Sequence, residues 1–108
     1  MGDKELLELA AKAAGIPRNQ WDYEYCRAHG HMVTRTMLWN PDTNGIEALR
    51  LAVHLDMSVE ISAYEESTYA YAGPVPRVYA MENWGDDKEA ATRRAIFRAA
   101  AEVGKAMP

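Results

Sequence analysis

The spacing of hydrophobic residues divides the chain into helical and extended stretches. Apolar residues recur three and four positions apart over residues 3–14, 44–55 and 86–106, a spacing that gathers them on one face of an α-helix. Gly15 and Pro17 follow the first stretch and favour a helix end there. The pattern predicts three amphipathic helices, each with a face to bury.

The second of these helices has the widest apolar face. Asn44 and Glu47 at its start have the spacing of a capping box, within a run of turn-forming residues. Its apolar residues cover more of the circumference than a helix on an open surface needs: Ile46, Ala48, Leu49, Ala52, Val53 and Leu55. We therefore expect this to be the most buried helix.

The third helix opens at Asp86, which has capping-box spacing with Glu89. Its apolar stripe is expected in the core and comprises Ile96, Ala99, Ala100, Val103 and Met107. Its polar stripe comprises Arg94, Arg98, Glu102 and Lys105, in which Arg98 and Glu102 have the spacing of an ion pair.

Between the second and third helices, apolar and polar residues alternate with the period of a strand that buries one face. Short turns separate three such stretches: Met57–Tyr64, Thr68–Ala72 and Arg77–Glu82. Consecutive strands joined by short turns are antiparallel, so they predict a three-stranded meander. Trp21–Cys26 and Met32–Leu38 alternate less regularly and indicate up to two further strands.

The order helix, irregular strands, helix, meander, helix predicts an α+β fold with helices packed on an antiparallel sheet. The chain has 108 residues, without repeats or linker-like tracts, which is the usual size of one domain. We therefore predict a single domain over residues 1–108. A chain of this length buries only about two-thirds of its unfolded surface, which leaves little room for an elaborate active site.

The charge balance narrows the class of protein. Twelve basic against 16 acidic residues give a net charge of -4, which argues against a non-specific nucleic-acid binder. No long apolar run predicts a membrane span, and the acidic first residues do not resemble a secretory signal. We therefore expect a cytoplasmic location. The single cysteine excludes an intramolecular disulfide.

Cys26, His29 and His31 form the most metal-like cluster in the sequence. Zinc takes thiolate sulfur and imidazole nitrogen, and a site needs at least three protein groups. The spacing matches none of the recurrent zinc patterns, and no fourth ligand lies nearby in the sequence. A metal- or thiol-dependent enzyme using these residues is an alternative to a polar loop.

Other catalytic patterns are missing from the sequence. The seven glycines are scattered singly, so there is no phosphate-binding loop, and no serine has the flanking glycines of a nucleophile elbow. The pairs Glu65–Glu66 and Asp86–Asp87 stand at turns or helix starts, where acidic residues are expected. The sequence predicts no catalytic residue and no cofactor.

Two groups of residues indicate a binding surface. Five aromatic residues of types enriched in protein interfaces lie on the predicted meander and just after it: Tyr64, Tyr69, Tyr71, Tyr79 and Trp84. Strands also favour these residue types for their own packing. Arg94 and Arg98 share a helix face, which could dock an anionic partner or form a solvated, ion-paired surface.

Several segments together resemble the family of small proteins grouped as the phage ABA sandwich domain. The resemblance rests on Trp39-Asn40-Pro41 before the second helix, on Met57–Tyr64, on the tyrosine-rich strand and on Ala91–Ile96 in the last helix. It covers roughly residues 39–107. Family members open the last helix with a proline, whereas this chain has Asp86 there.

The resemblance implies an α-β-α layered sandwich, an origin in a phage or prophage, and no assigned activity or ligand residue. The first hypothesis is therefore a phage accessory protein that binds a host or phage protein without catalysis. A narrower form is an inhibitor of a host defence complex. A nucleic-acid accessory role for the arginine helix is a weaker alternative, and no membrane partner is expected. The wide apolar faces on so short a chain also indicate a homodimer.

Overall fold

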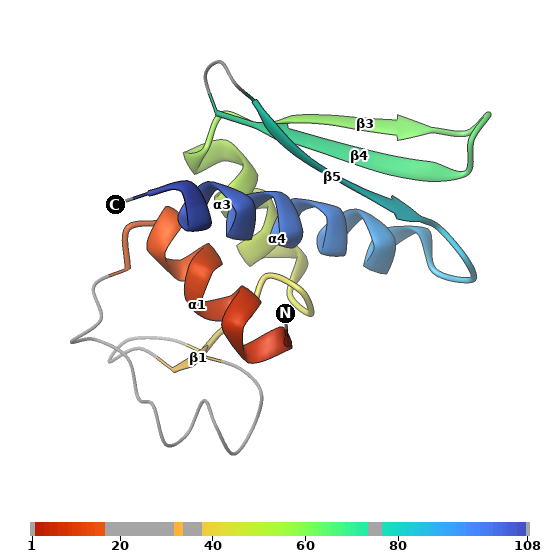
Figure 1. The fold of residues 1–108 in the computed structure, drawn as a ribbon. Coiled ribbons are helices and arrows are strands. Elements are labelled where there is room, and N and C mark those ends of the chain that lie inside the picture. Colours follow the sequence, from red (N-terminus) through yellow and green to blue (C-terminus); the bar gives the residue numbers. More distant parts are fainter. Residues whose placement is uncertain (1, 17–31, 34–37, 74–76, 108) are drawn as a thin grey trace.

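The computed structural model describes residues 2–16, 32–33, 38–73 and 77–107. Figure 1 shows its elements, which follow one another along the chain in this order: α1 Asp3–Ala13, β1 Met32–Val33, β2 Leu38–Trp39, α3 Gly45–His54, β3 Ser58–Ser62, β4 Ser67–Ala72, β5 Val78–Asn83 and α4 Lys88–Ala106. None of the helices in these ranges is long and apolar enough to cross a membrane. The predicted α+β fold class is confirmed.

The predicted antiparallel meander is present, with its strands in the order β3-β4-β5. Val59 pairs with Ala70, and Ala70 pairs with Ala80. Both alanines are buried beneath α4, which packs against β4 and β5. Tyr71 pairs with Tyr79 in the next row, and because side chains alternate along a strand, this row faces away from α4.

α4 packs on the sheet, and α1 and α3 each pack on α4 (Figure 1). Alanines fill much of the core between them: Ala70, Ala80, Ala95, Ala99 and Ala100. Among the described elements, all three helices lie on the same side of the sheet. Within the described residues, the sheet is therefore an outer layer of this packing, and no helix covers its other face.

The backbones of α1 and α4 lie unusually close together where the two helices cross. Gly104 lies against the backbone of α1, where an added Cβ would stand 1.9 Å from the carbonyl oxygen of Leu9. Ala10 and Ala11 of α1 are fully buried at the same contact between the helices. The small residues allow the two backbones to approach, which fixes α1 on the side of α4 away from the sheet.

The expectation that the second helix is the most buried one is wrong. Ile46, Leu49 and Val53 of α3 are 64%, 64% and 68% exposed. The buried apolar residues of α3 are Ala48, Leu51 and Ala52, on the side that faces α4. The helix is apolar on two sides, and within the described part of the chain only one of them is covered.

Side chains cap the first turns of α3 and α4, the two helices for which the sequence predicts a capping box. The side chain of Asn44 caps α3 by accepting from the amides of Ile46 and Glu47 at 3.0 and 3.1 Å. α4 is capped one residue later than expected, because Asp87, not Asp86, accepts from the amide of Ala90 at 2.9 Å.

The irregular region between the first two helices is described only in part. In place of one strand over Met32–Leu38, the short strands β1 and β2 pair with each other through Met32 with Trp39 and Val33 with Leu38. The strand expected over Trp21–Cys26 lies outside the described residues.

Candidate partner-binding surface

Three of the predicted tyrosines form a row on the sheet face away from α4. The rings of Tyr69 and Tyr71 are 6.2 Å apart and nearly parallel, at 10°. The rings of Tyr71 and Tyr79 are 5.9 Å apart at 29°. Offset parallel rings at such distances attract one another, so the three side chains form one preordered aromatic surface.

Met81 and Arg77 extend this row along β5 and at its start. Met81 pairs with Tyr69 across the strands and is 39% exposed, and Tyr79 is 62% exposed. The guanidinium of Arg77 lies 5.8 Å from the centre of the Tyr71 ring and donates to the hydroxyl of Ser58 at 3.2 Å. We refer to Tyr69, Tyr71, Tyr79 and Met81 as the tyrosine face.

Carboxylates border the tyrosine face. The hydroxyl of Tyr69 donates to Oε2 of Glu65 in the turn between β3 and β4. This hydrogen bond, with smaller contributions from loss of solvent and from the charge of Glu65, raises the pKa of Tyr69 above the ordinary value of a phenol. Glu60 pairs with Tyr69 on β3, so the row has acidic groups beside its Tyr69 end.

Tyr64 and Trp84 do not belong to the tyrosine face. Tyr64 lies in the β3–β4 turn and is 98% exposed. The indole of Trp84 donates from Nε1 to the hydroxyl of Thr68 at 3.0 Å, and Thr68 is buried against Thr92 of α4 with their hydroxyls 2.9 Å apart. Trp84 therefore links the connection between β5 and α4 to β4, and it is only half-exposed.

Arg94 and Arg98 are held in ion pairs with other elements. Nη1 of Arg94 lies 2.9 Å from Oδ2 of Asp42, in the turn before α3. Nη1 of Arg98 lies 2.7 Å from Oε1 of Glu82 on β5. The expected partner of Arg98 was Glu102, four residues along the helix, but the structure pairs it with the neighbouring strand.

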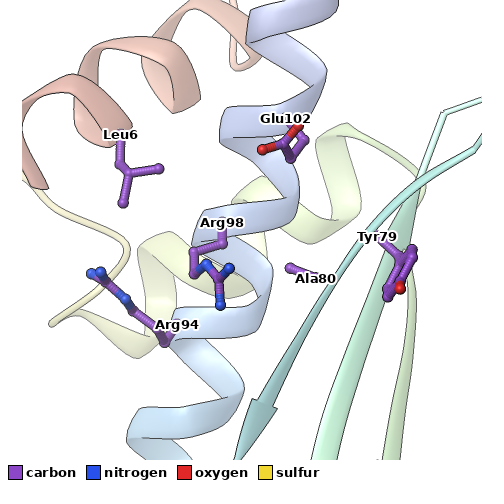
Figure 2. A pocket seen from close by; sticks show the side chains of 6 residues that line it. All are labelled: Leu6, Tyr79, Ala80, Arg94, Arg98 and Glu102. Atoms are coloured by element: carbon purple, nitrogen blue, oxygen red, sulfur yellow. The ribbon is translucent and has the colours of Figure 1, made fainter. Parts of the chain in front are cut away.

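The two arginines line a cavity of about 290 Å³ between α1, α4 and β5. Figure 2 shows the six side chains around it, with the arginines on α4 and Tyr79 on β5 across from them: Leu6, Tyr79, Ala80, Arg94, Arg98 and Glu102. Because the carboxylates of Asp42 and Glu82 already neutralise the guanidinium groups, this arrangement matches the ion-paired helix face better than an anion site.

The three metal-like residues Cys26, His29 and His31 lie outside the described residues, so a metal or thiol site there stays a prediction. Within the ranges that are described, no three His, Cys, Asp or Glu side chains are gathered closely enough to hold a metal ion.

Comparison with known protein families, with curated proteins and with solved structures finds no match. The resemblance to the phage ABA sandwich domain family stays a prediction from the residues of the chain.

Sequence reasoning identified the three tyrosines of the face but missed Met81 and the exposed apolar residues of α3. Met81 lies two residues after Tyr79 on β5. The two-residue period of a strand therefore places both side chains on the same face and could have identified Met81. The unusual width of the apolar face of α3 could have indicated its exposed apolar residues. A helix that is apolar on two sides needs two partners to cover them.

Proposed function

We propose that the protein acts by binding another protein through the tyrosine face, without catalysis. The observation that carries this proposal is the continuous row of stacked rings on a sheet face that no described helix covers. Aromatic residues and methionine are enriched in protein interfaces, since they bury a large area. Rings that already stack on one another lose little conformational freedom when a partner covers them.

The charges around the tyrosine face favour a protein over a nucleic acid as the partner. Glu60 and Glu65 lie beside Tyr69, whereas Arg77 is the basic side chain described against the rings. Stacking of nucleic-acid bases on aromatic rings normally needs a positively charged groove for the phosphates. An apolar centre with acidic neighbours suits a protein surface that presents an apolar patch flanked by basic residues.

A phage or prophage origin, a host or phage protein as the partner and action in the bacterial cytoplasm are parts of the same proposal. They are supported by the resemblance of residues 39–107 to phage proteins. The neighbouring genes test the origin. Genes for phage replication, assembly or counter-defence beside this one would support it, and neighbours that are all bacterial genes unrelated to phages would contradict it.

Substitution of two adjacent tyrosines of the row tests the binding surface. We expect Tyr71→Ser with Tyr79→Ser to reduce recovery of a specific partner from a lysate of the source bacterium at least tenfold. The reason is that truncation of a central aromatic residue typically costs more than about 1.4 kcal/mol, the equivalent of a tenfold change in affinity. The measurement is affinity capture with quantitative mass spectrometry.

The matched control is Tyr64→Ser, which removes a tyrosine that is 98% exposed but lies outside the row. This variant should recover the partner as the unaltered protein does. Equal recovery by the double variant and by the control, with circular dichroism showing both folded, would reject the tyrosine face as the binding surface.

A further inference from the structure

A second surface lies on the other side of the sheet, at its β3 edge. It combines exposed apolar side chains with a strand edge that pairs with no other strand in the described part of the chain. Val59 and Ile61 of β3 are 37% and 52% exposed, and they share the sheet face on which α4 packs, because they pair with Ala70 and Thr68. α4 packs against β4 and β5 and leaves these two side chains partly uncovered.

α3 precedes β3 in the chain and has exposed apolar residues of its own. Ile46, Leu49 and Val53 are spaced three and four residues apart and are each more than 60% exposed. A short connection turns the chain back from α3 into β3 at Asp56 (Figure 1). At the other end, Gly45 and Ile61 line one cavity of about 420 Å³ together with residues of α4. We call these five residues the α3–β3 patch: Ile46, Leu49, Val53, Val59 and Ile61.

The two edge strands of the sheet, β3 and β5, differ in how well they are protected from pairing with another strand. At β5, Arg98 contacts the carbonyl oxygen of Met81 at 3.4 Å and forms an ion pair with Glu82, so a side chain of α4 lies over that edge. β3 has one neighbouring strand in the described structure, β4. Its sequence, Ser-Val-Glu-Ile-Ser, has no proline and no lysine, two residues that commonly prevent an edge strand from pairing. Its one charged side chain is Glu60, on the sheet face away from α4.

We infer that β3 pairs antiparallel with β3 of a second copy of this chain, so that the two sheets join and the α3–β3 patches cover each other. The pattern of β3 reads the same from both ends: serine, β-branched aliphatic, glutamate, β-branched aliphatic, serine. A two-fold axis through an antiparallel pair requires such self-complementarity. The pairing of the two β3 strands brings the aliphatic side chains of both copies together on the α4 side of the joined sheet.

The charge of Glu60 selects the register of this pair. A two-fold axis at Glu60 would place the two glutamates directly opposite each other, which is unfavourable. With the axis at Val59, Glu60 faces the partner's Ser58, and with the axis at Ile61 it faces the partner's Ser62. Both registers keep the aliphatic side chains on the α4 side, so the axis lies at Val59 or at Ile61.

The area of the patch suits the centre of a dimer interface. An exposed aliphatic side chain offers on the order of 100 Å² to burial, so five residues at these exposures offer roughly 300 Å² per copy. A standard interface buries about 800 Å² per partner, a little over half of it apolar. The patch supplies much of the apolar part, and the strand edge adds hydrogen bonds.

The mass of the protein in solution tests the inference. We expect light scattering after gel filtration to give twice the mass of one chain at micromolar concentration. Leu49→Lys with Ile61→Lys should weaken the dimer on the order of 100-fold, because each substitution acts once in each copy, and should give the mass of one chain. Both positions are more than half exposed, so folding, followed by circular dichroism, should not change.

The tyrosine face provides the control that separates this inference from the proposed function. Tyr71→Ser with Tyr79→Ser should keep the mass of the dimer, whereas Leu49→Lys with Ile61→Lys should leave the sheet face with the tyrosines intact. A protein that is monomeric throughout this concentration range overturns the inference, as does a dimer that survives the two lysines.

Cross-linking gives a readout that does not depend on the lysine variant folding. In a Cys26→Ser background, which removes the only cysteine, either Val59→Cys or Ile61→Cys should form an intermolecular disulfide on mild oxidation. A disulfide needs Cβ atoms about 4 Å apart, which only the residue at the two-fold axis reaches. Glu60→Cys, on the opposite face, should not cross-link. Efficient cross-linking at residue 60 alone, or at none of the three positions, contradicts the pairing.

Discussion

The ends of α1 and α3 use the same hydrogen bonds with different residues. After α1, Gly15 has a φ of +78°, and after α3, Asp56 has a φ of +50°. In both cases the next amide donates back to the last turn, as Met57 does to the carbonyl of Ala52 at 2.9 Å. Glycine is the residue best suited to this conformation because its lack of a Cβ removes the steric cost.

We therefore expect Asp56→Gly to raise the free energy of unfolding by about 1 kcal/mol. The substitution relieves the left-handed backbone and removes a negative charge from the negative end of α3. Asp56→Ala, which removes the charge but keeps the Cβ, is the control and should gain less. Urea unfolding of the three proteins measures the difference, and a glycine variant no more stable than the alanine variant would show that the backbone at residue 56 carries no cost.

Single residues were predictable from the sequence where their partners are close along the chain. Asn44 and Gly15 act within a few residues of themselves, so their capping roles follow from local spacing. The partner of Arg98 was not predictable in this way. Glu82 lies on a different element, 16 positions away, and only the packing of α4 on β5 brings it closer than the local candidate Glu102.

At the scale of the elements, the contact between α1 and α4 depends on Gly104. Alanine normally stabilises the interior of a helix relative to glycine by about 1 kcal/mol. Here the added Cβ would meet the Leu9 carbonyl oxygen at 1.9 Å, so the helices must move apart. We expect Gly104→Ala to lower the free energy of unfolding by about 2 kcal/mol, in the range of overpacked cores.

Gly45 provides a matched control for Gly104. It is the first residue of α3, and a Cβ there would meet nothing within 4 Å. Gly45→Ala should therefore leave stability unchanged or raise it slightly, since alanine restricts the unfolded chain. Thermal unfolding followed by circular dichroism compares the two variants. Equal effects at both positions would mean that the helix crossing tolerates the extra methyl group.

The elements themselves were largely predictable because each has a clear period. The meander and both ends of α4 lie within two or three residues of the sequence-based bounds. The burial of α3 was not predictable, since its amphipathic pattern reports how much of the helix is apolar and not how many neighbours it has. Of its two apolar sides, α4 covers the one with Ala48 and Leu51, and Leu49 is left exposed.

For the molecule as a whole, the sequence listed candidate binding residues but could not sort them by face. Tyr69, Tyr71 and Tyr79 fall on one side because of the strand register, while Trp84 reaches Thr68 on the α4 side. Which face stays open depends on where the helices pack, and that is a property of the tertiary structure. The same packing leaves the α3–β3 patch uncovered at the β3 edge.

Two copies joined at β3 should unfold together, which makes thermal stability depend on concentration. Since dissociation accompanies unfolding, more protein favours the folded dimer by mass action. For a domain of this size, we expect the midpoint temperature to rise by about 3 °C for each tenfold increase in concentration. Leu49→Lys with Ile61→Lys should remove this dependence, while Tyr71→Ser with Tyr79→Ser should keep it. A midpoint that does not change with concentration in the unaltered chain would show that pairing through the α3–β3 patch does not stabilise the folded state.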